Sequence, residues 1–191
     1  MKKILIIIAV LLVTMLGSKL FFPPTVPADI AEIQSYCKRN GFDTEHCVLV
    51  DFSRPSGMNR FYIYSFREGK ITHKSLCANG HGKEWNIFCN KFSNEPGSNY
   101  SSLGKYRVGK MRNMYCKPHW PGFVLYGLDK TNSNALDRGI LIHKGNPPFQ
   151  LFPLPAVPMS RGCFAVSQRM MKQLEEVQRA SSKPLLLYAY K

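Results

Sequence analysis

Short stretches in which apolar and polar residues alternate recur along this chain. Such alternation predicts strands, because successive side chains of a strand point to opposite faces of its sheet. Two of the stretches flank Glu68 and Gly69, which predicts a hairpin with its turn at these residues. The predicted strands lie in CVLVDFS, RFYIYSF, KITHKSL, FVLYGLD, GILIHKG, FAV and PLLLYAY.

Two segments have the apolar spacing of a helix instead. Residues 28–40 place their apolar side chains on one stripe, and residues 168–180 do the same after Ser167, a favourable N-cap residue. Residues 78–122 are rich in Gly, Asn, Ser and Pro, so we expect loops around short strands there. Strands outnumber helices, and the pattern predicts a mainly β domain with a helix before the core and another near its end.

The N-terminus is an apolar segment. Two lysines precede residues 4–16, which are apolar apart from one threonine. This run is shorter than the ~20 residues of a membrane-spanning helix and favours a secretory signal, but a retained anchor also fits. We therefore expect a signal peptide or N-terminal anchor over 1–22, a linker and helix over 23–47, and the β-rich domain over 48–191.

Export changes how the cysteines are interpreted. An oxidising compartment favours disulfides, and no spacing among the six cysteines matches a zinc ligand set, so no metal is expected. The close pairs Cys37–Cys47 and Cys77–Cys89 are the expected disulfides, although four paired cysteines allow three connectivities.

The chain is strongly basic. It has 26 Lys and Arg against 12 Asp and Glu, a net charge of +14. The basic residues are scattered and no nucleic-acid motif accompanies them, so we expect no nucleic-acid partner. An anionic wall polymer or membrane surface fits an exported protein better.

A histidine and a cysteine each lie at an end of a predicted strand, His143 after ILI and Cys163 before FAV. A cysteine attacks as the thiolate, and a nearby imidazole is its usual activator. Gly162 lets a substrate approach the backbone, where amide N–H groups can hold an oxyanion. Taken singly, such a histidine is more often a hydrogen-bonded core residue, and a lone cysteine of an exported protein is more often one half of a disulfide.

Three blocks of the chain resemble, in the same order, the murein L,D-transpeptidase catalytic domain family of bacterial cell walls. These are FSNEPGSNYSSLGKYRVG, LYGLDKTNSNALDRGILIHKG and SRGCFAVS. The L,D-transpeptidase signature has a histidine followed by Ser or Thr, His, Gly and Cys, and the 16 residues between His143 and Ser160 fit its spacing. The resemblance covers roughly residues 59–166 and implies a β-sandwich of the L,D-transpeptidase type.

The resemblance implies a role for each residue that matches the signature. Cys163 matches the nucleophile and His143 its general base and acid, with the carbonyl of Lys144 or Gly145 orienting the imidazole. Arg161 stands where the widespread signature has a second histidine. Its guanidinium either faces the thiolate and a substrate carboxylate or forms a salt bridge with a structural carboxylate.

Further residues around this pair are expected to bind substrate or an oxyanion. They are Gly162, Arg161, Ser160, Lys144, Tyr126 and Arg138. His81 and His119 are weaker candidates for substrate contact, because a loop histidine beside glycine or an aromatic residue also fits a structural role.

The implied function is that of an exported, cofactor-independent enzyme of the bacterial periplasm or cell envelope. Cys163 would form a thioester with a peptidoglycan stem tetrapeptide, and an amine or water would resolve it, giving transpeptidase or L,D-carboxypeptidase activity. Membrane contact is expected only through an N-terminal anchor. Two alternatives stay open, an exported cysteine hydrolase of wall peptides and a non-catalytic, disulfide-braced binder of an anionic wall polymer.

Overall fold

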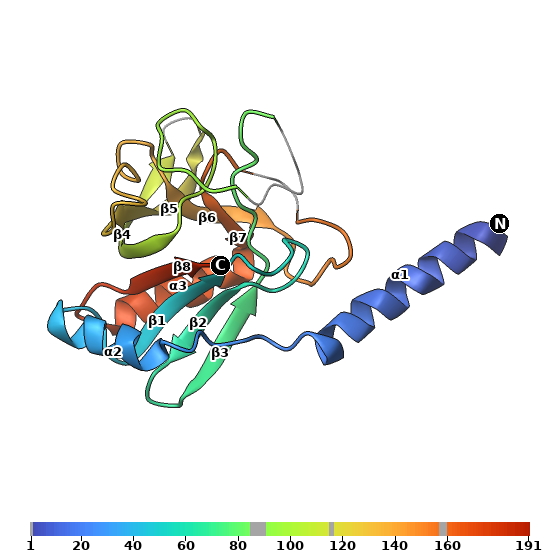
Figure 1. Ribbon diagram of the computed structural model, residues 1–191, viewed down its shortest axis with the longest axis horizontal. Coiled ribbons are helices and arrows are strands. Elements are labelled where there is room, and N and C mark those ends of the chain that lie inside the picture. The colour runs from blue at the N-terminus through green and yellow to red at the C-terminus, as the bar shows by residue number, and fades with distance from the viewer. Residues whose placement is uncertain (1, 85–90, 115–116, 157–159) are drawn as a thin grey trace.

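The structure is a computed structural model that describes residues 2–84, 91–114, 117–156 and 160–191. The helices in this part of the chain are α1 (Lys2–Phe21), α2 (Ile30–Arg39) and α3 (Gln168–Ala180). The strands are β1 (His46–Asp51), β2 (Phe61–Ser65), β3 (Lys70–Ser75), β4 (Gly104–Met114), β5 (Lys117–Gly127), β6 (Leu141–Asn146), β7 (Phe164–Ser167) and β8 (Leu186–Tyr190). Figure 1 shows α1 extending away from the β-rich body.

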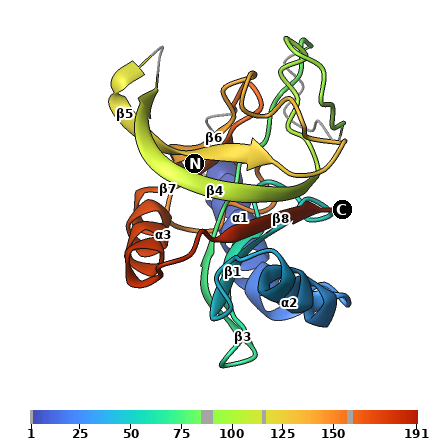
Figure 2. The same ribbon diagram turned by 90° about the vertical axis from the view of Figure 1, so that its left-hand side faces the viewer.

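All eight of these strands form one mixed sheet in the order β3-β2-β1-β8-β4-β5-β6-β7. Neighbours are antiparallel except the parallel pairs β1–β8 and β6–β7. The two ends of the sheet meet where Ala78, just after β3, donates to the Ala165 carbonyl of β7 at 2.9 Å and accepts from its N–H at 3.2 Å. The sheet therefore closes into a barrel-like shape, with β4 and β5 strongly curved (Figure 2).

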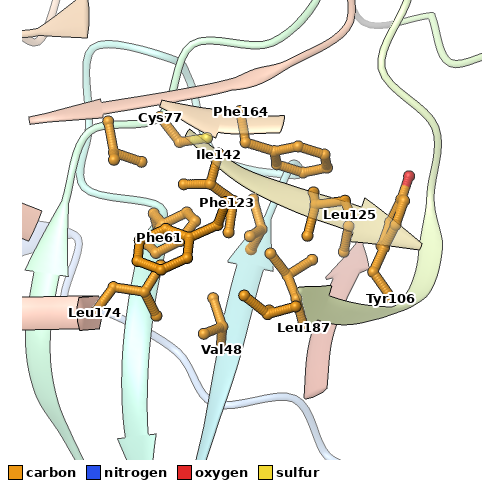
Figure 3. Close-up of a cluster of buried hydrophobic side chains, with 14 of the residues drawn as sticks. Val48, Phe61, Cys77, Tyr106, Phe123, Leu125, Ile142, Phe164, Leu174 and Leu187 are labelled. Carbon is orange, nitrogen blue, oxygen red and sulfur yellow. The ribbon is translucent and has the colours of Figure 1, made fainter. Parts of the chain in front are cut away.

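One face of each central strand points into the closed interior. Val48 of β1, Leu125 of β5 and Phe164 of β7 are fully buried there, as Figure 3 shows. Leu174 reaches the same cluster from α3, whose first turn is capped by the Ser167 hydroxyl accepting from the Met170 N–H at 3.1 Å. The predicted N-cap and buried stripe of this helix are therefore confirmed.

The outer face of the sheet is covered unevenly. α2 packs Ile33 and Cys37 against Leu49, Tyr62 and Leu186, which belong to β1, β2 and β8. In Figure 2, α2 lies beside β1 and β8 and away from β5 and β6. The outer face of β4 to β7 is thus left to loops and solvent, and the candidate site lies there.

The predicted fold class is confirmed, but the expectation of loops around short strands over residues 78–122 is wrong in its later part, from Gly104 onward, where the strands are long. β4 and β5 are 11 residues long each. A register shift between Val108 and Met111 interrupts the alternation that would have revealed β4. Pro121 lies in β5 just before the residues that pair with β6. The N–H that proline lacks is therefore not needed for a hydrogen bond between β5 and β6.

α1 is longer than the apolar run of residues 4–16 and continues to Phe21. Its apolar side chains project outward, with Ile4, Leu5 and Ile6 all more than half exposed. Among the helices described here, none has both the length and the hydrophobicity that crossing a bilayer requires. The division of the chain at residues 22 and 47 stays a prediction.

The expected pairing of Cys37 with Cys47 is wrong, since both are thiols in the structure. They are fully buried in the cluster between α2 and the sheet, where the hydrophobic surroundings raise the pKa of Cys37 to about 12. Cys77 is also a buried thiol, and its expected partner Cys89 lies outside the described residues.

Candidate active site

His143 and Cys163 lie on neighbouring segments of the chain, where β6 and β7 run side by side. Ile142 and Phe164 are Cα partners that point into the core, so alternation turns His143 to the outer face. Cys163 directly precedes β7, and its Sγ accepts a hydrogen bond from the Leu141 N–H at 3.4 Å. The sulfur therefore lies beside the backbone of β6, two residues away from His143.

The imidazole of His143 has a fixed orientation. The ring is buried, with 8% exposure, and Nδ1 lies 2.7 Å from the carbonyl oxygen of Lys144. A carbonyl can only accept, so Nδ1 carries the proton and the neutral ring has its lone pair on Nε2. The predicted main-chain contact with Lys144 is present, and it leaves Nε2 as the basic nitrogen.

Cys163 follows a tight turn that its neighbours hold in place. Gly162 has a φ of +116°, which only glycine adopts readily, and its N–H donates to Ser160 Oγ at 3.2 Å. The Ser160 hydroxyl in turn donates to the Cys163 carbonyl. The Gly162 amide is therefore engaged within the turn in this conformation, whereas the sequence suggested a donor for an oxyanion.

The half-buried sulfur of Cys163 is surrounded by backbone polar groups. Besides the Leu141 N–H, the carbonyl of Gly139 lies 3.7 Å from Sγ and can accept from the thiol. Ile140 and Ile142 fill the inner face at this point, so the sulfur opens to the outer face. A hydrogen bond donated to sulfur favours the thiolate over the thiol.

One serine connects the turn before Cys163 with a distant segment. Ser101 Oγ donates to the Gly162 carbonyl at 2.9 Å and accepts from the Gly80 N–H at 2.9 Å. His81 is next to this contact, and its N–H donates to the Ser160 carbonyl at 3.0 Å. The buried His81 therefore supports the turn through its backbone, a placement that the sequence did not indicate.

Arg138 lies behind the same turn. Its Nη1 donates to the Ser93 carbonyl at 2.7 Å, and its Nη2 donates to the Tyr100 carbonyl. A Cβ built on Gly162 would lie 3.2 Å from Nη2, so the guanidinium is packed against the residue before Cys163.

The charge of Arg138 interacts with that of Cys163. Burial lowers the pKa of Arg138, and negative charge on Tyr106 and on Cys163 opposes this shift. Attraction between two charges acts on both, so the guanidinium favours the thiolate form of Cys163. Arg161, for which this role was one of two expectations, has an exposed side chain and takes no part in the ion pairs found among the described residues.

Tyr126 and His119 are the other aromatic candidates. Tyr126 is half-buried on β5, and the Arg107 guanidinium lies 3.8 Å from the centre of its ring. The side chain of His119 lies outside the described part of the structure. No cluster of three His, Cys, Asp or Glu able to hold a metal occurs among the residues that the structure describes.

A thiol and an oriented imidazole on neighbouring strands of a β-rich barrel, with a cation behind the thiol, are groups suited to nucleophilic acyl transfer. The chain matches the L,D-transpeptidase catalytic domain family over residues 25–190. It therefore belongs to the L,D-transpeptidase catalytic domain family. No curated protein sequence matches it.

Several solved structures are similar to the chain over part of their length. One is the helical cell shape determining protein Pgp2 from Campylobacter jejuni, at 18% identity and a TM-score of 0.45, covering 76% of this chain and 47% of that one. An L,D-transpeptidase from Mycobacterium smegmatis has 10% identity and a TM-score of 0.44 and covers 77% and 59%. An Enterococcus faecium L,D-transpeptidase mutant has 12% identity and a TM-score of 0.44 and covers 78% and 50%. The chain spans about half the length of these proteins.

Proposed function

We propose that this chain is an exported cysteine acyltransferase that forms a thioester on Cys163 with peptidoglycan stem tetrapeptides, and so cross-links or trims them. The observation that carries this proposal is the 2.7 Å contact of His143 Nδ1 with the Lys144 carbonyl, which leaves Nε2 as the basic nitrogen on the outer face, the face to which the Cys163 sulfur also opens. Membership of the L,D-transpeptidase catalytic domain family supports the reaction class.

The first step forms the thioester. His143 Nε2 takes the proton of the Cys163 thiol, and the sulfur attacks the carbonyl that links the third and fourth residues of the stem. The tetrahedral intermediate collapses as the C–N bond breaks, and the imidazolium gives its proton to the leaving amine of D-alanine. Arg138 supports this step by favouring the thiolate.

The second step releases Cys163. An amine of a neighbouring stem attacks the thioester, His143 removes its proton, and the sulfur leaves to recover the thiol. Water in place of the amine gives a shortened stem and free enzyme, which is L,D-carboxypeptidase activity. Thioesters react readily with amines, and a site that restricts water favours the cross-linking outcome.

Export fits the apolar helix α1 and the strongly basic composition. We propose that residues 1–22 are a signal peptide or an anchor and that the domain works in the periplasm or cell envelope. N-terminal sequencing of the protein recovered from the envelope distinguishes the two, because cleavage removes the start of α1 and anchoring retains it.

The function is tested by incubating purified wall sacculi with the protein and analysing the muropeptides by mass. New cross-links formed by the third residue of a donor stem, or shortened stems, are expected with the wild type and are absent with Cys163→Ala. Incubation with a carbapenem, followed by intact mass, should show one adduct that Cys163→Ala does not form. A protein that changes no muropeptide and forms no adduct would be the non-catalytic binder instead.

A further inference from the structure

Arg107 and Tyr126 form a preorganised pair on the outer face of the sheet. They are Cα partners on β4 and β5, and both alternate with core residues, so both point outward. The guanidinium carbon lies 3.8 Å from the centre of the tyrosine ring. Gly109 makes room for this ring, because a Cβ there would lie 2.5 Å from Tyr126 Cε2.

This pair lies in line with the nucleophile. Val124 of β5 pairs with Leu141 of β6, and continuing that antiparallel register by two residues places Tyr126 opposite Gly139. The Gly139 carbonyl is the one that lies 3.7 Å from Cys163 Sγ. A row across the outer face therefore runs from Arg107 through Tyr126 to Gly139, the residue whose carbonyl neighbours the Cys163 sulfur.

The charge of Arg107 is not neutralised by a described carboxylate. The ion pairs in the described part of the chain do not include it, whereas Lys105, two residues earlier on the same face, lies 3.9 Å from Asp129. Stacking on an aromatic ring fixes the plane of a guanidinium and leaves its N–H groups for a bidentate acceptor. A half-buried cation held in this way is suited to a planar carboxylate.

We propose that Arg107 binds a carboxylate of the stem peptide whose carbonyl Cys163 attacks. This rests on the function proposed above and adds the recognition of one anionic group. Two spacings of about 4.8 Å separate β4 from β6, so the guanidinium is roughly 10 Å from the sulfur. That distance equals about three residues of extended peptide, or one long side chain, beyond the attacked carbonyl.

The terminal carboxylate of the fourth residue is only one residue from the attacked carbonyl and falls short of this distance. Two other groups of the donor stem reach it, the backbone carboxylate of its second residue and the side-chain carboxylate of a third-residue diamino acid. Both offer the same chemistry to a guanidinium. Donor tetrapeptides amidated at one or the other carboxylate tell them apart. If Arg107 binds a given carboxylate, amidation of that carboxylate should give the wild type and the Arg107→Gln variant the same KM.

The test compares Arg107→Gln with Lys110→Gln, which removes an exposed charge on the same strand. Loss of a charge-assisted bidentate contact should raise KM for the acidic donor about tenfold in Arg107→Gln, with kcat changed less than about twofold. Lys110→Gln should keep the wild-type KM. With the correct amidated donor, wild type should show the same tenfold increase and Arg107→Gln no further increase.

Several results would overturn the proposal. An Arg107→Gln variant with the wild-type KM contradicts carboxylate binding. So does a KM of Arg107→Gln that stays above the wild-type value with both amidated donors. Either result leaves the enzymatic function intact. Wild-type protein that neither turns over the donor nor forms a carbapenem adduct refutes the proposed function and this inference together. Thermal unfolding of both variants at the wild-type temperature confirms that the comparison concerns binding.

Discussion

Replacing Arg138 tests whether the cation behind the nucleophile turn sets the reactivity of Cys163. Arg138→Gln removes the charge and most of the fork that holds the Ser93 and Tyr100 carbonyls. Arg138→Lys keeps the charge and loses the fork. The two variants therefore separate the electrostatic effect on the thiol from the structural effect on the loop.

The expected magnitude follows from the geometry. Nη2 of Arg138 lies 3.2 Å from the Cβ position of Gly162, and since successive Cα atoms are ~3.8 Å apart the guanidinium is on the order of 8 Å from the Cys163 sulfur. Two unit charges at about 8 Å attract by about 2 kcal/mol at an effective dielectric constant of about 20. Both side chains are partly exposed, and screening by solvent halves this to ~1 kcal/mol, a little under one pKa unit.

The assay is the rate of Cys163 alkylation by iodoacetamide as a function of pH, followed by intact mass. We expect the midpoint to rise by about one unit in Arg138→Gln and to stay near the wild-type value in Arg138→Lys. Both variants should unfold at a lower temperature, because both lose carbonyl contacts. An unchanged midpoint in Arg138→Gln, with the protein still folded, would show that the guanidinium does not act on the sulfur.

Two further predictions concern stability. Gly162→Ala should lower the free energy of unfolding by about 1 to 3 kcal/mol, because φ is +116° and the new Cβ would lie 2.8 Å from Ile140 Cδ1. Gly41→Ala is the control in calorimetry, because Gly41 has a φ of +72° but open space around its Cβ position. An equal loss of stability in Gly41→Ala would contradict the clash at Gly162. Burial raises the pKa of Cys37 and of Cys77 from 9.0 to about 12, so above pH 9 the unfolded chain releases protons that the folded protein retains. Urea unfolding should therefore show stability falling between pH 9 and pH 12, by up to about 1.4 kcal/mol per pH unit for each thiol; constant stability over this range would refute it.

Local patterns were enough to predict most of the fold. The hairpin of β2 and β3 turns at Gly69, whose φ of +64° suits glycine, and Ser167 caps α3 as its position suggested. The length of β4 and β5 was missed because a bulge and prolines break the alternation. Closure of the sheet was also missed, since Ala78 and Ala165 are far apart in sequence and carry no signal of their pairing.

The site was predicted only in part, for a related reason. His143 and Cys163 follow from strand ends and from the resemblance, and the Lys144 carbonyl from its position beside the histidine. The supports of the turn are backbone and hydroxyl contacts between distant segments, such as Ser101 with Gly80 and Gly162. Such contacts leave no periodicity or spacing in the sequence, and the same holds for the placement of Arg138 behind Gly162.

The closure of the sheet at Ala78 and Ala165 affects how a peptide can be held. β7 has a neighbour on each side at this point, so a ligand cannot extend the sheet next to the nucleophile as an added strand. Strand addition demands the regular twist of an L-peptide, because its backbone groups must match a ladder. Recognition of a ligand through its carboxylates places no such requirement on the ligand backbone. The proposed substrates, wall stems with D residues, are therefore compatible with this site.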